Sequence, residues 1–261
     1  MSEPTRLYNS VAPLANVARL QQLIDRCQNR AHGLPGMGCF FGRAGHGKTT
    51  AGVYAQNRLS AVHVEAKSLG GVRKLLEMIV QELGLRPLST ASRLFDQAAE
   101  ELARTGRPLI IDEADRILKE TQIETIRDLY EATQVPVILM GEESLPQKLT
   151  RWERVHGRML AWVGAEPATI EDVGHLAAIY AGGIEITPDL RAAVLAASRG
   201  SLRYVATNLA NLREFAAVRG LVRVALSDWQ GEFHTGEPPL IRRGAALPLP
   251  VAATARRRGA A

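Results

Sequence analysis

The sequence has few cysteines and no long apolar run. Its two cysteines, Cys27 and Cys39, match neither a metal-binding spacing nor a disulfide framework. No apolar run reaches the ~18–20 residues that a membrane span requires. The N-terminal residues MSEPTRLYNS lack the apolar stretch of a signal peptide. We therefore expect a cytoplasmic protein with no membrane partner. Cys39 is expected to be a small buried residue.

Aromatic residues are also scarce, at 5% of the 261 residues, so the core must rest on Ala, Leu, Val and Ile. The length allows one large domain or a core domain with a small satellite. The net charge of +5 permits a nucleic-acid partner without demonstrating one. A tail that is basic only for solubility is an equal alternative, because part of the charge comes from Arg242, Arg243, Arg256, Arg257 and Arg258.

Helical and strand patterns alternate up to about residue 165. Helical spacing predicts helices over 16–30, 49–59, 72–83, 90–104 and 122–132. Short apolar runs predict strands over 37–41, 61–65, 109–111, 135–140 and 159–163. Several of these runs are continuously apolar, which is typical of strands covered on both faces. The order predicts an α/β domain with a mostly parallel sheet flanked by helices.

The pattern changes near Glu166-Pro167. Beyond it only helical spacing is found, over 169–180, 188–198, 202–218 and 225–233, which predicts a small all-helical domain. From about Gly236 the chain is rich in Pro, Ala and Arg, a composition typical of a flexible tail. The expected divisions are an N-terminal segment and helix at 1–35, the α/β core at 36–165, the helical domain at 166–235 and the tail at 236–261.

A phosphate-binding loop follows the first predicted strand. The residues GRAGHGKT, from Gly42 to Thr49, match the pattern G-x-x-x-x-G-K-[ST] in full. Its glycines let backbone N–H groups turn toward phosphate oxygens, and the next helix presents its positive end to the same anion. The side chains of Arg43 and His46 are interpreted as fillers. The residues expected to bind the nucleotide are Gly42, Gly45, His46, Gly47, Lys48, Thr49 and Thr50.

An acidic pair, Asp112-Glu113, ends the predicted strand 109–111. A carboxylate at the end of a buried strand can hold Mg²⁺ together with the hydroxyl of Thr49, and Asp112 suits that role. Glu113 is placed to orient or deprotonate an attacking water. An apolar run ending in Asp-Glu is common, but its position downstream of a phosphate loop makes it specific. Asp115 and Arg116 are expected to make local contacts at a helix start.

Hydrolysis also needs positive charge near the transferred phosphate. Candidates lie in the segment 151–158, where Arg154 and Arg158 are predicted one helical turn apart and Arg151 is nearby. Solvated surface arginines are the alternative interpretation. Arg203 lies in the first turn of the long helix predicted from 202, where a cation is mildly unfavourable against the helix dipole. That position suggests a functional contact for Arg203.

Together these features resemble an AAA+ ATPase: the phosphate loop, the IIDEAD strand end, the VPVILMG strand and a helical lid with SRGSLR. Within that superfamily, three stretches resemble the B proteins of Mu-like transposing phages and related transposon target-selection ATPases. They are GRAGHGKTTA, GRPLIIDEADRI and EITPDLRAAVLAASRGSLRYVATNL. The resemblance covers about residues 15–220 and implies a P-loop AAA+ domain followed by a small helical lid.

The resemblance implies ATP and Mg²⁺ as cofactors. The residues alone do not distinguish ATP from GTP. It implies that the ATP-bound protein assembles into a helical filament on double-stranded DNA without strong sequence preference, and recruits and activates a transposase. Hydrolysis would release it from DNA, in the host bacterial cytoplasm if it is phage-encoded. The implied roles are nucleotide and Mg²⁺ contacts for Lys48 and Thr49, Mg²⁺ coordination for Asp112, catalysis for Glu113, action in trans for Arg158 and a lid sensor for Arg203.

Two departures from the family pattern stand out. The polar sensor after the fourth core strand would fall at Glu142, where an acidic side chain repels phosphate unless it is protonated or turned away; Ser144 is the alternative. The chain before the loop is too short for the extra N-terminal DNA-binding region of the phage relatives, so the inner surface of the filament is expected to bind DNA. The candidates there are Lys67, Arg73 and Lys74, for which an exposed basic helix start is an equal interpretation.

Two other classes of function stay open. Another AAA+ role, such as replication or helicase loading or a secretion-associated ATPase, would use the same loop and acidic pair. A secretion protein usually carries a membrane segment or a peptidoglycan-binding module, and neither is visible in the sequence. A nucleotide-dependent switch with negligible turnover is the third class, and Glu113 argues against it.

Overall fold

The computed structural model describes residues 13–238, so most of the expected tail and all of its arginines lie outside the described residues. Five strands form one sheet in the order β2-β3-β4-β1-β5, and every neighbouring pair is parallel. The predicted parallel sheet is confirmed, with small shifts at the strand ends. The strands are β1 (Met37–Phe41), β2 (Val62–Glu65), β3 (Leu109–Asp112), β4 (Val137–Gly141) and β5 (Met159–Gly164).

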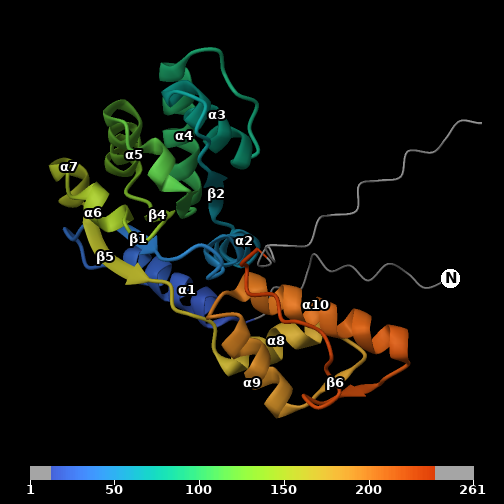
Figure 1. Cartoon of the computed structure of the whole chain (residues 1–261). Coiled ribbons are helices and arrows are strands. Elements are labelled where there is room, and N and C mark those ends of the chain that lie inside the picture. Colours follow the sequence, from blue (N-terminus) through green and yellow to red (C-terminus); the bar gives the residue numbers. More distant parts are fainter. Residues whose placement is uncertain (1–12, 239–261) are drawn as a thin grey trace, which may run out of the picture.

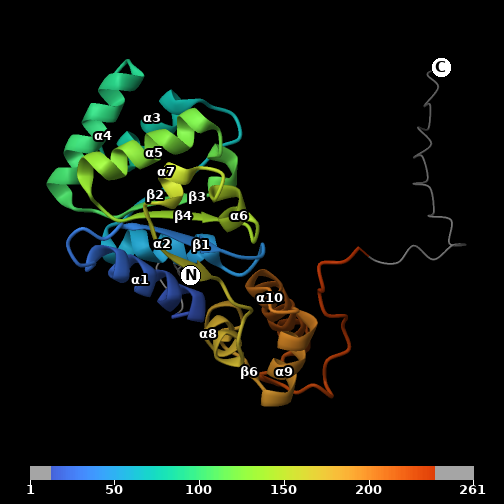
Figure 2. The ribbon, with the colours of Figure 1, turned by 90° about the vertical axis from the view of Figure 1, so that its left-hand side faces the viewer.

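Helices cover both faces of the sheet (Figure 2). On one face lie α1 (Ala15–Gln28) and α2 (Lys48–Leu59), and on the other lie α3 (Val72–Glu82), α4 (Ala91–Thr105) and α5 (Glu120–Thr133). Alternate strand residues enter the two cores: Phe40 packs with α1 and α2, whereas Cys39 packs with the opposite helices. Burial on both faces explains why β4 and the first three residues of β3 are apolar.

Local sequence signals set the two ends of α4, and burial sets the reactivity of the two thiols. The Thr90 hydroxyl accepts a hydrogen bond from Arg93 N at 3.3 Å, and Gly106 ends α4 in the left-handed conformation. Cys39 is buried as predicted, and Cys27 is buried as well. Burial raises the pKa of Cys27 to about 11 and raises that of Cys39 further, so neither thiol is reactive at neutral pH.

The C-terminal part of the described chain forms a lid that lies beyond one end of the sheet (Figure 1). It contains α8 (Ile170–Tyr180), α9 (Pro188–Ala197) and α10 (Leu202–Arg219). A short parallel pair, β6 (Glu185–Ile186) and β7 (Arg223–Val224), joins them and was not predicted. Short helical segments in the core are η1 (Ala114–Ile117), α6 (Leu145–Leu149) and α7 (Glu153–His156).

The helix predicted over 225–233 is wrong. Asp228 closes a turn there by accepting a hydrogen bond from Ala225 N at 2.8 Å. Beyond the turn, Trp229 packs against Phe215 of α10 with ring centroids 5.1 Å apart, and Phe233 packs on Trp229. The apolar residues that suggested a helix therefore anchor an irregular segment to α10.

Asn16 joins the lid to the core. Its side-chain amide donates to His46 O at 2.8 Å and to Glu166 O at 2.7 Å, and its Oδ1 accepts from Glu166 N at 2.9 Å. Asp172 of α8 also accepts from Ala15 N at the start of α1. The start of α1 thus holds both the phosphate loop and the connection to the lid. Within residues 13–238, no helix is long and apolar enough to cross a membrane.

Candidate nucleotide-binding site

The carboxyl ends of three neighbouring strands meet at one edge of the sheet. The phosphate loop follows β1, Asp112 and Glu113 end β3, and Glu142 follows β4. Because β3, β4 and β1 are parallel neighbours, their carboxyl ends bring these segments together. This is the edge at which open α/β sheets bind their ligands.

The phosphate loop is pressed against the start of the lid helix α10. Gly45 and Gly47 have φ of +86° and +80°, a conformation that favours glycine. A Cβ on Gly45 would lie 2.5 Å from Ser201 Oγ, and one on Gly47 would lie 2.6 Å from Leu202 Cδ1. Glycine is therefore required twice, for the turn and for the close approach of the lid.

The start of α2 is open to an anion. No side chain of the described residues caps this helix, so its first N–H groups keep their capacity to bind phosphate oxygens. Lys48 is folded back over the loop, with Nζ donating to Gly42 O at 2.6 Å and to Arg43 O at 2.9 Å. Burial lowers the pKa of Lys48, although Asp112 and Glu113 act in the opposite direction. The Lys48 ammonium therefore lies next to the position that a phosphate bound by the loop would occupy.

Asp112 is 1% exposed, and one of its carboxylate oxygens has no partner. Oδ1 accepts from Glu113 N at 2.8 Å, whereas Oδ2 is buried without a hydrogen bond among the described residues. Burial opposes a charge here, yet the His63 imidazole, the Thr49 hydroxyl and the Glu113 amide together lower the pKa of Asp112. An ionised buried carboxylate with a free oxygen beside a threonine hydroxyl is a donor set suited to Mg²⁺.

Glu113 has an unusual backbone conformation. Its φ of +55° is in the left-handed region, which is uncommon for residues other than glycine and concentrates at functional sites. The side chain is 39% exposed and lies 3.3 Å from an Arg116 guanidinium nitrogen. Glu113 therefore lies at the mouth of the site, accessible to water.

A cleft of about 620 Å³ lies beside the contact between the phosphate loop and the lid, and residues of both line it. This volume lies in the usual range for small-molecule sites. Its polar side carries Lys48, Thr49, Glu113 and Glu142, and Arg203 enters from α10. The lid side is largely apolar. Residues on the apolar side are Leu14, Leu176, Tyr180, Leu202, Ala206 and Ala210. One polar end and one apolar end match the phosphate and base ends of a nucleotide.

Comparison with known proteins agrees with this geometry. Residues 31–149, which include the phosphate loop and the acidic pair, match the AAA domain family. This match covers 119 of the 261 residues, so it makes that segment similar to an AAA domain. Among curated proteins, none is significantly similar to the chain in sequence.

Solved structures with the same fold extend the likeness of the AAA domain into the lid. The Aeropyrum pernix Orc1 protein in complex with DNA has a TM-score of 0.58 and 18% identity, over 87% of this chain and 66% of that one. Cdc6p from Pyrobaculum aerophilum has a TM-score of 0.58 and 14% identity, over 85% and 65%. The chain spans slightly less than two thirds of either structure. Identities this low show the fold alone, which is an AAA+ domain with helices after the sheet.

The structure groups most of the predicted site residues in this cleft. Thr50 and Arg203 line the same cleft as Lys48, and Arg203 N donates to Gly45 O at 3.4 Å. His46 is 6% exposed, its carbonyl accepts from Asn16, and its Nδ1 lies 3.4 Å from Ala165 O. Asn16 was missed, because a lone asparagine at a helix start gives no sign of distant partners.

Asp115 corrects another expectation. Local helix-start contacts were predicted, but its carboxylate accepts from Glu142 N and from Lys148 Nζ, both at 2.7 Å. A Cβ on Gly141 would lie 2.2 Å from Asp115 Oδ2, so glycine is needed there. Asp115 thus fixes the turn after β4. It is Glu142, and not Ser144, that lines the cleft.

Arg158 lies at the other edge of the sheet. It directly precedes β5, at the amino end of the sheet, and forms an ion pair with Glu131. Gly157 and Arg158 line a second cleft of about 590 Å³ together with Arg30 and Gln134. The predicted helical spacing of Arg154 and Arg158 is wrong, because α7 ends at His156. Arg158 does not contribute to the nucleotide cleft of its own chain.

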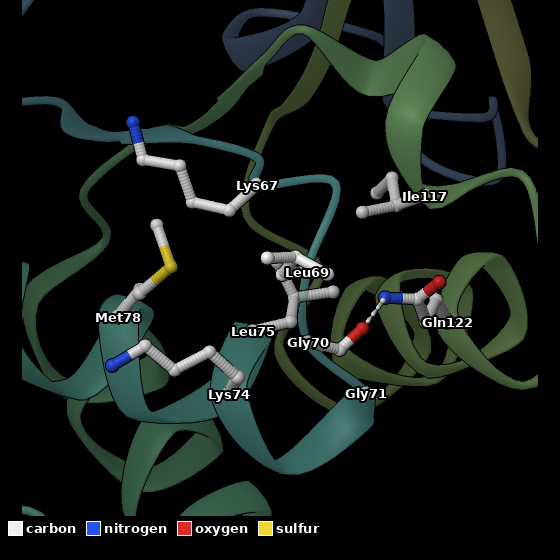
Figure 3. A pocket seen from close by; sticks show the side chains of 9 residues that line it. All are labelled: Lys67, Leu69, Gly70, Gly71, Lys74, Leu75, Met78, Ile117 and Gln122. Carbon is white, nitrogen blue, oxygen red and sulfur yellow. Dashed lines mark hydrogen bonds between the residues drawn. The ribbon is translucent and has the colours of Figure 1, made fainter.

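The basic residues after β2 are half-exposed and paired with acidic side chains. Lys67 lies 2.9 Å from Glu65, while Arg73 and Lys74 lie 3.1 and 3.6 Å from Glu77. In Figure 3, Lys67 and Lys74 extend to the same side, with Met78 between them. Near them, Leu69 is 90% exposed. The predicted basic surface is therefore present but partly neutralised.

Proposed function

We propose that the chain is an ATPase that binds ATP with Mg²⁺ and hydrolyses it to ADP and phosphate. The observation that carries this proposal is the free Oδ2 of Asp112, buried beside Thr49 and next to an uncapped helix start. Bound Mg²⁺ would neutralise charge on the phosphate oxygens. ATP is preferred to GTP on the family resemblance alone.

Each residue of the cleft has a separate role in this proposal. Lys48 leaves the loop carbonyls for the outer phosphates, and Thr49 and Asp112 hold the metal. Glu113 orients the attacking water or takes its proton. Arg203 approaches from the lid, so closure of α10 on the loop adds positive charge where hydrolysis needs it.

The substitution Glu113→Gln tests hydrolysis directly. It keeps the size of the side chain and removes the base, so the variant should bind ATP and Mg²⁺ like the wild type while turnover falls by about 10²-fold or more. Turnover is measured by phosphate release, and binding by calorimetry. Equal slow turnover in both proteins would favour a nucleotide-dependent switch without catalysis.

We further propose that the ATP-bound protein assembles on double-stranded DNA without strong sequence preference. Lys67, Arg73 and Lys74 would contact DNA phosphates, and Arg158 would act on the nucleotide of a neighbouring subunit. Support comes from the resemblance to the phage B proteins and from the shared fold with an Orc1 protein solved with DNA. Salt pairs with Glu65 and Glu77 would have to be exchanged for phosphate contacts.

Two candidate biological roles are proposed. Target selection and transposase activation in DNA transposition is the first candidate, supported by the three stretches that resemble the phage proteins. Replication or helicase loading is the second, favoured by the fold shared with Orc1 and Cdc6p. Electron microscopy with duplex DNA and a slowly hydrolysed ATP analogue separates them: continuous nucleotide-dependent filaments support the first, and isolated particles on DNA support the second.

A further inference from the structure

A buried histidine faces the free oxygen of Asp112. His63 lies in β2, next to β3 in the sheet, and its side chain is 7% exposed. Its Nε2 lies 3.7 Å from Asp112 Oδ2. Both atoms are buried, and neither has a hydrogen-bond partner among residues 13–238. Two unpartnered buried polar atoms that face each other are uncommon, because each leaves its desolvation uncompensated.

Space for the imidazole is provided by a glycine inside α2. A Cβ on Gly52 would lie 2.6 Å from His63 Nε2 and 2.8 Å from its Cε1. Glycine is the least favourable residue for a helix interior apart from proline, and this one lies in the helix that begins at the phosphate loop. The helix therefore accepts a poor helix former at the position where the ring approaches.

The two carboxylate oxygens of Asp112 have different environments. Oδ1 is held by Glu113 N at 2.8 Å, so the orientation of the group is fixed at one oxygen only. A carboxylate oxygen accepts two hydrogen bonds or ligands, so Oδ2 can receive a donor from His63 and keep a lone pair for a metal-bound water. A separation of 3.7 Å exceeds hydrogen-bond length, and a small shift of the ring closes it.

We propose that His63 is a positioning residue: its Nε2–H donates to Asp112 Oδ2 in the nucleotide-bound state and holds the carboxylate in the orientation that binds Mg²⁺. This inference rests on the proposed function, because it assigns His63 to the metal site of that ATPase. His63 itself touches neither nucleotide nor metal. Gly52 serves the same purpose by leaving room for the ring.

The test measures how ATP-analogue binding depends on Mg²⁺, without hydrolysis. A slowly hydrolysed ATP analogue is titrated calorimetrically into the full chain over a series of Mg²⁺ concentrations, and also in EDTA. His63→Leu should raise the Mg²⁺ concentration for half-maximal tightening roughly tenfold or more, the usual effect of losing a partner of a metal ligand. Affinity in EDTA should not change. His63→Gln, which keeps an amide donor, should recover most of the Mg²⁺ dependence.

Gly52→Ala gives an independent arm, with Gly174→Ala as its matched control. Gly174 lies inside α8, and a Cβ there would meet nothing within 4 Å. Both changes favour a helix, but only Gly52→Ala should displace the imidazole and weaken the response to Mg²⁺. Melting curves check that each variant is folded. If Gly52→Ala does not fold, the comparison of His63→Leu with His63→Gln still tests the proposal.

The outcomes separate this inference from the proposed function. A wild-type protein that takes up no analogue, with or without Mg²⁺, would refute the proposed function. If the wild type tightens with Mg²⁺ and His63→Leu tightens at the same concentration, the positioning role is overturned alone. The same holds if His63→Gln behaves like His63→Leu, because the donor would then be irrelevant.

Discussion

Lys48 shows at the residue scale how the site changes its contacts. Its ammonium now donates to two loop carbonyls, and these are contacts that a phosphate can replace. Charge-assisted hydrogen bonds of this kind contribute about 1.5–3 kcal/mol each. The position of Lys48 in the cleft therefore makes it a substantial contributor to the triphosphate affinity that we propose.

Replacing Lys48 by alanine should weaken binding of the ATP analogue by about 10²-fold or more, because the charge-assisted contacts of its ammonium with the phosphates are lost. Calorimetry measures the affinity, and Lys119→Ala, an exposed lysine before α5, is the control. ATP-dependent assembly on DNA should be lost as well. Undiminished DNA filaments from the Lys48 variant would contradict the proposed coupling of ATP to assembly.

Single residues differ in how well the sequence predicts them. The loop residues and Asp112 were predicted because their chemistry depends on a fixed local spacing after a strand. Asn16, His63 and Asp115 were not, because their partners lie far away in the chain. A histidine inside the apolar strand 61–65 was the only hint of the His63 site. The pairing of β2 with β3, which brings His63 near Asp112, is visible only in the structure.

At the scale of elements, the start of α1 supports the phosphate loop. Asn16 is 3% exposed, and its side chain makes three hydrogen bonds to His46 and Glu166. Removing it leaves buried backbone groups without partners, which costs about 1–3 kcal/mol for each such group. The same loss would loosen the loop from the lid connection.

Asn16→Ala should therefore lower the free energy of unfolding by about 3 kcal/mol, measured by urea denaturation. Asn57→Ala, an exposed asparagine in α2, is the control and should change stability by about 0.5 kcal/mol at most. A loss in the Asn16 variant no larger than in this control would show that the contacts do not hold the lid connection.

Helices were predicted well where the helical spacing was long, and strands were predicted well where helices cover both of their faces. The five strands and the three lid helices followed from apolar runs and helical spacing. The pair β6 and β7 was missed because two residues per strand give no alternation. The helix expected over 225–233 failed because Trp229 packs on Phe215 of α10 and Phe233 packs on Trp229, so long-range packing outweighed local spacing.

For the whole molecule, the two edges of the sheet carry different parts of the proposed mechanism. The phosphate loop lies at the carboxyl edge, and Arg158 lies before β5 at the amino edge, paired with Glu131. One chain cannot bring both to a single nucleotide. A role for Arg158 in hydrolysis therefore requires a head-to-tail contact between copies.

Mixing two inactive variants tests this arrangement. Glu113→Gln supplies Arg158 and binds nucleotide but does not hydrolyse it, and Arg158→Ala binds nucleotide but supplies no arginine. Each alone should hydrolyse ATP at least about tenfold more slowly than the wild type, because an arginine acting in trans contributes about 10³-fold or more. A mixture should recover turnover, measured by phosphate release with DNA present. Arg154→Ala is the control, and no recovery in the mixture would exclude Arg158 as the trans residue.

The most direct test of the central claim is calorimetric titration of the folded wild-type chain with a slowly hydrolysed ATP analogue, with and without Mg²⁺. The free oxygen of Asp112 predicts binding that tightens with Mg²⁺, and Asp112→Asn should abolish the tightening while preserving the fold. Folded wild-type protein that takes up no triphosphate in the presence of Mg²⁺ would contradict the account.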